Sequence, residues 1–198
     1  MLRPRPASRH ILTAYGHSWV QGDGASRPTN RLVDVVARRL HCEPTNFGAG
    51  GTLSTDTADL LCRQRPPASR MYLVMTGLND ARLRGASSVG LESFSTALQA
   101  IFRAFRTANP AALTVAVEQP HLANYSLHAP HDRGSDEIID AYNRRLRGVA
   151  GRHGVVLASV AGWNPETMLC ADTVHPNDAG HAQVADAVVR AVQMRGRW

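Results

Sequence analysis

Residues 71–80 read Met-Tyr-Leu-Val-Met-Thr-Gly-Leu-Asn-Asp. The first five are apolar without alternation, which is typical of a strand that is covered on both faces of a parallel sheet. The polar residues Asn79 and Asp80 then follow the carboxyl end of this strand. Because open α/β sheets bind their ligands beyond such ends, the stretch predicts both a fold class and the place of a site.

The rest of the chain repeats this alternation of strands and helices. Apolar runs at 11–15, 113–117 and 155–160 predict strands, and a short extended stretch leads into a glycine turn at 46–51. Helical spacing predicts helices over 30–40, 91–108 and 135–153, with others after Ser54 and near Asn177, and Asn30 and Ser54 are the expected N-caps. We therefore expect a single domain over 1–198, an α/β fold with a five-stranded parallel sheet, and a flexible N-terminal tail over 1–9.

Composition excludes several classes of protein. The 198 residues include 22 Lys plus Arg, all of them Arg, against 16 Asp plus Glu, and only 6% are aromatic. An arginine bias of this kind is typical of a GC-rich genome, so we expect no nucleic-acid partner. No window approaches the ~18 apolar residues of a spanning helix, and we expect no membrane insertion. Three cysteines without paired spacing, and no secretion signal, favour a cytoplasmic protein without a zinc site.

Ser18 is the first residue that could carry chemistry. It lies in Tyr15-Gly16-His17-Ser18-Trp19, directly after a predicted strand and at the start of a helix. Free backbone N–H groups at such a position stabilise a developing oxyanion, as nucleophilic serines require. Taken alone, this stretch favours a role for Ser18 as a helix N-cap.

Asp172 and His175 form a second candidate pair, three residues apart and just before the last helix. The carboxylate can accept a hydrogen bond from His175 Nδ1, which leaves Nε2 free to act as a base. The pair alone could be a capping turn with a surface histidine. Together with Ser18 it provides a nucleophile, a base and a group that orients the base.

Gly48 and Asn79 are candidate oxyanion donors. A glycine lets its backbone N–H approach a ligand closely, and an asparagine amide donates without titrating. With the amide of Ser18 they would give three donors. Each residue alone is also common in turns, as a turn glycine or an Asx cap.

Four segments around these residues resemble the motifs of the SGNH hydrolases, also called GDSL-type esterases and lipases. The resemblance extends from Gly16 to His181. The matching blocks are Gly16-His17-Ser18, Asn46-Phe47-Gly48, Gly77-Leu78-Asn79-Asp80 and Asp172-Thr173-Val174-His175-Pro176. The resemblance implies a flavodoxin-like three-layer α/β/α fold, an acyl-serine intermediate on Ser18, base catalysis by His175, no cofactor and no metal.

The chain departs from the family pattern at two positions. His17 replaces the usual aspartate, and Trp19 is bulkier than the leucine or small residue that is common there. We expect His17 and Trp19 to contact the substrate. Two consequences stay open: a reshaped pocket, or a titrating group beside the nucleophile. Asp23 is expected to be structural, and His181 to be buried beside the sheet.

The sequence therefore predicts a serine-dependent esterase with a small-molecule acyl ester of small or medium size as substrate. Two alternatives stay open. The first is an acyltransferase, whose acceptor pocket the long loop at 118–133 would form. The second is a carbohydrate-binding or acyl-binding module without activity. The loop histidines His121, His128 and His131 match no compact zinc pattern, which favours loop polarity or substrate contact over a metal site.

Overall fold

The computed structural model describes residues 10–196 and contains the expected parallel sheet. Its five strands are β1 (Ile11–Gly16), β2 (Glu43–Gly48), β3 (Met71–Met75), β4 (Leu113–Val117) and β5 (Val156–Ala158), in the spatial order β2-β1-β3-β4-β5. All four neighbouring pairs are parallel. The predicted fold class is confirmed, whereas the expected tail at 1–9 lies outside the described residues.

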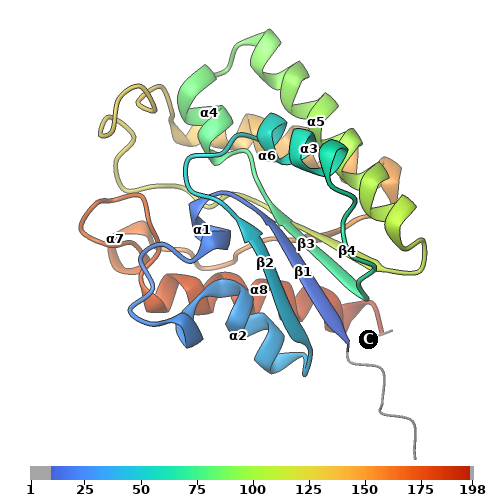
Figure 1. The fold of residues 1–198 in the computed structure, drawn as a ribbon. Helices are drawn as coiled ribbons and strands as arrows, with labels where there is room; N and C mark the ends of the chain where they lie inside the picture. The colour runs from blue at the N-terminus through green and yellow to red at the C-terminus, as the bar shows by residue number, and fades with distance from the viewer. Residues whose placement is uncertain (1–9, 197–198) are drawn as a thin grey trace, which may run out of the picture.

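Helices cover both faces of the sheet (Figure 1). One layer contains α3 (Ser54–Arg63), α4 (Leu78–Arg84), α5 (Ser88–Ala108) and α6 (Asp136–His153), and the other contains α2 (Leu32–Arg39) and α8 (Asp178–Met194). The short helices α1 (Ser18–Gln21), η1 (Pro28–Asn30) and α7 (Pro165–Met168) lie in the connections. Sequence periodicity missed α4, α7 and η1, because short helices carry little periodic signal.

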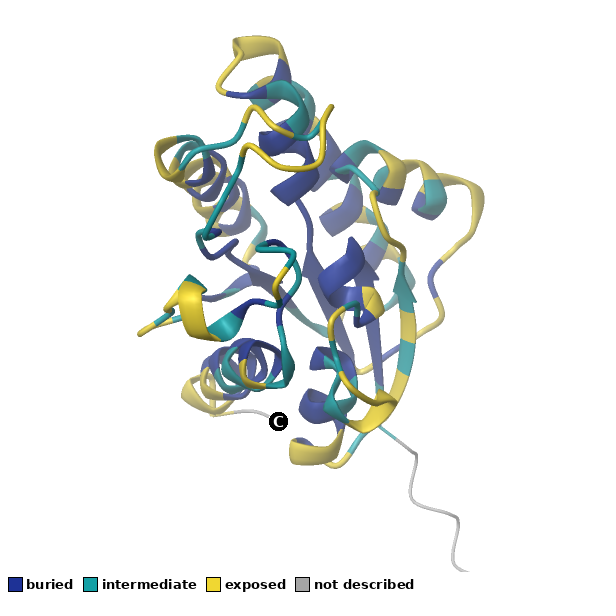
Figure 2. Ribbon diagram, turned by 90° about the vertical axis from the view of Figure 1, so that its left-hand side faces the viewer, coloured by how far each residue is buried: buried dark blue, intermediate teal, exposed yellow. Residues whose placement is uncertain are grey.

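Strand β3 lies within the hydrophobic core. All five residues of β3 are buried, and Figure 2 shows buried strands beneath helices whose exposed faces point outward. The ring of Tyr72 on β3 stacks on that of Phe105 from α5, with ring centroids 4.5 Å apart. This stacking joins the central strand to the apolar stripe of the longest helix.

Two of the expected helix caps are wrong. Helix α2 begins at Leu32 with Arg31 as N-cap, because Asn30 ends the preceding 3-10 turn and donates its side chain to Asp178 Oδ2 at 2.7 Å. Helix α3 has Leu53 as N-cap, and the Asp56 carboxylate accepts the Leu53 N–H. Both predicted capping side chains instead bind carboxylates of distant segments, Asn30 that of Asp178 and Ser54 that of Asp80.

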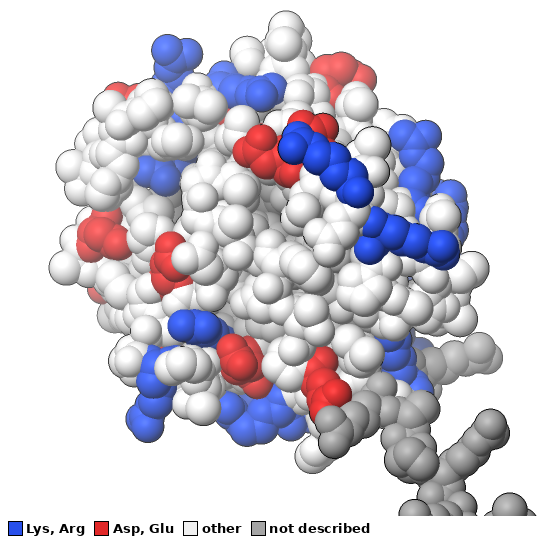
Figure 3. Space-filling model, in the orientation of Figure 1, with Lys and Arg blue, Asp and Glu red and all other residues white. Residues whose placement is uncertain are grey.

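The surface shows how the arginine excess is distributed. On the face seen in Figure 3 the arginines are spread over several places and are interspersed with Asp and Glu, and the middle of the face is largely uncharged. No helix within residues 10–196 is both long enough and apolar enough to cross a membrane.

Candidate active site

The candidate residues meet at the carboxyl edge of the sheet. Ser18 follows β1, the glycine loop (residues 49–52) follows β2, Asn79 follows β3, and the turn that carries His175 precedes α8. Strands β1 and β3 end in close contact, because a Cβ atom on Gly16 would lie 2.0 Å from the Met75 carbonyl oxygen, and Gly16 has φ of +145°. Glycine at this position therefore allows the chain to turn into the site.

Asp172 holds His175 in one orientation. His175 Nδ1 lies 2.7 Å from Asp172 Oδ2, while Asp172 Oδ1 accepts the backbone N–H groups of Val174 at 3.0 Å and His175 at 2.9 Å. Partial burial acts to raise the pKa of Asp172, but these hydrogen bonds outweigh it, so the pKa is lowered. A carboxylate at this position selects the tautomer in which His175 Nε2 is unprotonated and can act as a base.

Ser18 is the first residue of α1 and is 5% exposed. His17, not Ser18, is the N-cap of this helix, which removes the alternative role that the sequence left open for the serine. Within residues 10–196 neither the Ser18 hydroxyl nor its backbone N–H has a hydrogen-bond partner. Both groups are available to a substrate.

His17 is completely buried, and two hydrogen bonds fix the orientation of its ring. Gln119 Nε2 donates to the Thr76 carbonyl at 3.1 Å, so Gln119 Oε1 must accept from His17 Nε2, which is also 3.1 Å away. His17 Nδ1 accepts the Trp19 N–H at 3.3 Å. This pattern requires the neutral imidazole with its proton on Nε2.

The expectation that His17 contacts substrate is therefore wrong, and so is the alternative that it titrates beside the nucleophile. Burial lowers its pKa to about 4; the hydrogen bond that His17 donates to Gln119 acts to raise the pKa, and the charges of His175 and Arg82 act to lower it further. A side chain that is 0% exposed cannot touch a substrate. His17 instead caps α1 and holds Ser18 in place.

Burial of neutral His17 should make folding pH-dependent. The folded-state pKa of about 4 lies below the ordinary value of 6.5, so the unfolded chain binds a proton that the folded chain excludes between these pH values. Stability is then fully present above about pH 6.5, and about 3 kcal/mol is lost as the pH falls towards 4. Urea denaturation of wild type and His17→Asn across this range checks the prediction.

The asparagine variant is the matched comparison because Asn is also a good N-cap and does not titrate. The free energy of unfolding of His17→Asn should fall less steeply with acidity than that of wild type. Other groups, such as buried His181, contribute equally to both proteins. Equal slopes would show that His17 is already protonated in the folded state.

Trp19 is also 0% exposed, so its expected contact with substrate is wrong as well. Its indole N–H donates to the Val174 carbonyl at 3.0 Å, and its ring lies against that of Trp163 with centroids 5.5 Å apart. Because Val174 precedes His175, Trp19 links the helix of the nucleophile to the turn of the base. Its bulk has a positioning role.

The glycine loop changes the assignment of one oxyanion donor. The Gly48 N–H donates to the side chain of Asn46 at 2.8 Å, and Gly48 packs so closely on α1 that a Cβ there would lie 2.3 Å from the Gln21 nitrogen. The N–H of Gly51, which has φ of +75°, has no partner among the described residues. The structure thus offers Gly51 as the free donor, and the spacing of glycines at 48, 50 and 51 was the signal that could have indicated it.

Asn79 lies beside that loop, and Asp80 supports it. Asn79 is 5% exposed and uses one amide hydrogen to bind the Thr52 carbonyl at 3.0 Å, which leaves the second hydrogen free. The fully buried Asp80 carboxylate accepts from the Ser54 N–H at 2.9 Å and the Ser54 hydroxyl at 2.6 Å. Adjacent residues thus have separate roles: Asp80 anchors α3, and Asn79 faces the loop.

The loop after α1 is also tied to α8. The expected burial of His181 is confirmed at 1% exposure, and its Nε2 lies 3.0 Å from the Asp23 carbonyl oxygen. Asp23 also donates its N–H to the Ser18 carbonyl at 3.0 Å. The backbone of Asp23 is structural, as expected, but sequence reasoning gave no role to its carboxylate, which lies beside His175.

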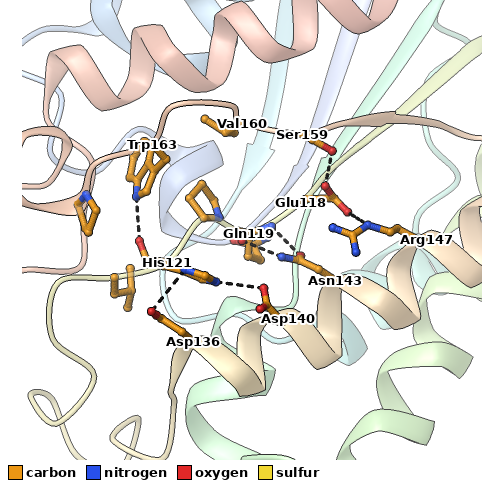
Figure 4. A pocket seen from close by; sticks show the side chains of 13 residues that line it. Glu118, Gln119, His121, Asp136, Asp140, Asn143, Arg147, Ser159, Val160 and Trp163 are labelled. Atoms are coloured by element: carbon orange, nitrogen blue, oxygen red, sulfur yellow. Dashed lines mark hydrogen bonds and ion pairs between the residues drawn. The ribbon is translucent and has the colours of Figure 1, made fainter.

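The long loop (residues 118–135) borders the site and a separate pocket. His128 Nε2 lies 3.2 Å from the Asp172 carbonyl oxygen, so the loop contacts the turn that holds the base. Behind His17 is a pocket of about 500 Å³, in which Glu118 contacts Ser159 and Arg147 (Figure 4). Residues 10–196 contain no group of three or more His, Cys, Asp or Glu side chains arranged to hold a metal ion.

Comparisons with known proteins show the family of the chain and agree with its fold. Residues 14–183 match the GDSL-like lipase/acylhydrolase family, and no curated protein matches the chain. LAE5, an α/β hydrolase from the metagenome of Lake Arreo in Spain, is 22% identical over 93% of this chain and 95% of its own, with a TM-score of 0.69. TesA is 18% identical over 93% and 99%, with a TM-score of 0.70. An acetyl xylan esterase from Geobacillus stearothermophilus is 19% identical over 92% and 94%, with a TM-score of 0.67.

Proposed function

Because the chain belongs to the GDSL-like lipase/acylhydrolase family, we propose that it hydrolyses a small or medium acyl ester through an acyl-serine intermediate on Ser18. The observation that carries the proposal is the Asp172–His175 pair at the edge where Ser18 lies with an unpartnered hydroxyl. A base with an orienting carboxylate and a free serine at the same edge of the sheet are the groups that serine hydrolases use. A binding module has little use for them.

In the proposed first step, His175 Nε2 removes the Ser18 proton while Ser18 Oγ bonds to the ester carbonyl carbon. The carbonyl π electrons move to oxygen, and the tetrahedral intermediate collapses with departure of the alcohol, which takes the proton from Nε2. Water then attacks the acyl-serine in the same way and releases the acid. Asp172 remains a carboxylate throughout and stabilises the imidazolium.

The oxyanion is stabilised by three donors in this proposal. These are the backbone N–H groups of Ser18 and Gly51 and the free amide hydrogen of Asn79. All three lie at the carboxyl ends of adjacent strands, and none of these hydrogens has a protein partner within residues 10–196. Donors that are already oriented stabilise charge that develops only in the transition state. Gly51 replaces Gly48 in this set because the Gly48 N–H is already used.

A fluorophosphonate probe tests the serine assignment directly. We expect one adduct on wild type by intact-mass measurement, much slower labelling of His175→Ala, and none on Ser18→Ala. Ser88→Ala is the control, because Ser88 is an exposed serine at the start of α5, remote in sequence from the motifs. No adduct on wild type, or an adduct that persists in Ser18→Ala, would contradict the proposal.

Hydrolysis and acyl transfer share the same acyl-serine and differ in what resolves it. Turnover of an aryl ester in the presence of a competing alcohol distinguishes them. A hydrolase yields the free acid, whereas a transferase yields a new ester. We expect the acid as the main product.

A further inference from the structure

The carboxylate of Asp23 lies beside His175, the base of the proposed mechanism. Asp23 Oδ2 is 4.0 Å from His175 Nε2, and the two side chains are 36% and 30% exposed. This is the only polar contact of the Asp23 carboxylate recorded among the described residues. Its position is therefore set by the backbone of Asp23 and not by a partner.

The backbone of Asp23 is held firmly. Its N–H donates to the Ser18 carbonyl and its carbonyl accepts from His181, directly after Gly22, which ends α1 in a left-handed conformation with φ of 105°. On the opposite side the carboxylate faces the glycine loop, since a Cβ on Gly50 would lie 3.5 Å from Asp23 Oδ2. The carboxylate thus lies between the base and the loop that carries the Gly51 donor.

The mechanism places the leaving group beside this charge. His175 Nε2 must come within about 3 Å of the leaving oxygen to return its proton. An oxygen that close to Nε2 is within about 7 Å of Asp23 Oδ2, by the sum of the two distances. A cationic group two or three bonds further along the alcohol can therefore reach contact distance with the carboxylate.

Of the three carboxylates around this point, that of Asp23 is the one without a hydrogen-bond partner among the described residues, and the cation beside this loop is Arg31, whose side chain packs on Gly22. The other carboxylate on His175, Asp172, is already satisfied by two backbone amides and the imidazole. Asp178 is satisfied by Ser26 and Asn30. His181, on the other side of the Asp23 backbone, is buried, and burial lowers its pKa.

We propose that Asp23 selects the charge of the substrate's alcohol portion, favouring esters of cationic alcohols and disfavouring esters of anionic ones. The inference rests on the proposed function, because it needs His175 to serve the leaving group. Attraction between unit charges a few ångströms apart at a half-exposed site corresponds to about tenfold in rate. Asp23 is thus a specificity residue, distinct from the triad.

Two esters of equal shape provide the test. Acetylcholine and 3,3-dimethylbutyl acetate differ only in a quaternary nitrogen in place of a carbon. Wild type should have a higher kcat/KM for acetylcholine, and Asp23→Asn should lower the ratio of the two kcat/KM values about tenfold, because the intrinsic reactivity of the two esters is the same for both enzymes. Asn keeps the shape of the side chain and all backbone contacts. Asp59→Asn is the charge-matched control, because Asp59 lies on α3 with its side chain 67% exposed, and it should keep the wild-type ratio.

A second readout removes any dependence on acyl-chain preference. The rate of Ser18 phosphonylation by methylphosphonates with the same two leaving groups should show the same response to Asp23→Asn. A wild-type ratio near one, or equal losses for both compounds in Asp23→Asn, would overturn the inference, since equal losses mean that Asp23 acts through His175 alone. No reaction of wild type with any phosphonate would instead reject the proposed function.

Discussion

Replacing Ser18 with alanine should lower kcat for an aryl ester by about 10⁴-fold or more, because the variant lacks the nucleophile of the proposed mechanism. The variant should fold normally. The Ser18 hydroxyl bonds to no described residue, and the cap of α1 is provided by His17. Steady-state kinetics together with urea denaturation would show lost activity at unchanged stability.

His175→Ala should have an effect of similar size, and the double variant should lose little more. Nucleophile and base act as one unit, so their contributions are not additive. Ser88→Ala should keep the wild-type kcat. If Ser18→Ala retained more than a few per cent of wild-type turnover, the acyl-serine mechanism would be wrong.

The fold was predictable because strong local patterns agree with the tertiary structure. Residues Met71–Met75 are apolar throughout and form the central strand, buried on both faces. The stripe of Phe94, Leu98, Ile101 and Phe105 likewise predicted a long helix that packs on the sheet. Burial of a continuous apolar face dominates both elements, so local pattern and global packing agree.

Hydrogen bonds between distant segments were not predictable from local patterns. Asn30 and Ser54 are good N-caps by residue type, yet Asp178 binds the first at 2.7 Å and Asp80 binds the second at 2.6 Å. These partners are 148 and 26 positions away in the chain. Propensity gives way to tertiary contacts of this kind, which sequence alone does not reveal.

In the candidate site, too, contacts between neighbouring residues were predictable and contacts between distant residues were not. Asp172 and His175 are three residues apart, so their pairing could be predicted from spacing, and they lie in hydrogen-bond contact. His17 could not be interpreted in this way, because its neutral state depends on Gln119, 102 positions away. Gly51 could not be chosen over Gly48 either, because what each amide contacts is settled only in the folded loop. The carboxylate of Asp23 required the folded loop before its proximity to His175 could be seen.

Replacing Asn79 with alanine should have a large effect without involving the nucleophile or the base. Loss of one oxyanion donor should lower kcat by about 10²-fold to 10³-fold and leave KM nearly unchanged, because the donor acts mainly on the transition state. Labelling of Ser18 by the fluorophosphonate should become slower but still reach completion. Kinetics with aryl esters, beside intact-mass measurement of labelling, would show both effects.

Asn79→Asp is a second test of the donor role, because a carboxylate, like the alanine side chain, can donate neither to the Thr52 carbonyl nor to the oxyanion. Asn79 also binds the Thr52 carbonyl at 3.0 Å, so alanine removes one structural hydrogen bond, worth about 1 kcal/mol, together with the catalytic donor. Aspartate keeps the size of the side chain but places a carboxylate near the forming oxyanion, so its kcat should be lower than that of alanine. If both variants changed kcat by less than a few-fold, the amides of Ser18 and Gly51 alone would form the oxyanion hole, and Asn79 would serve only to hold the glycine loop.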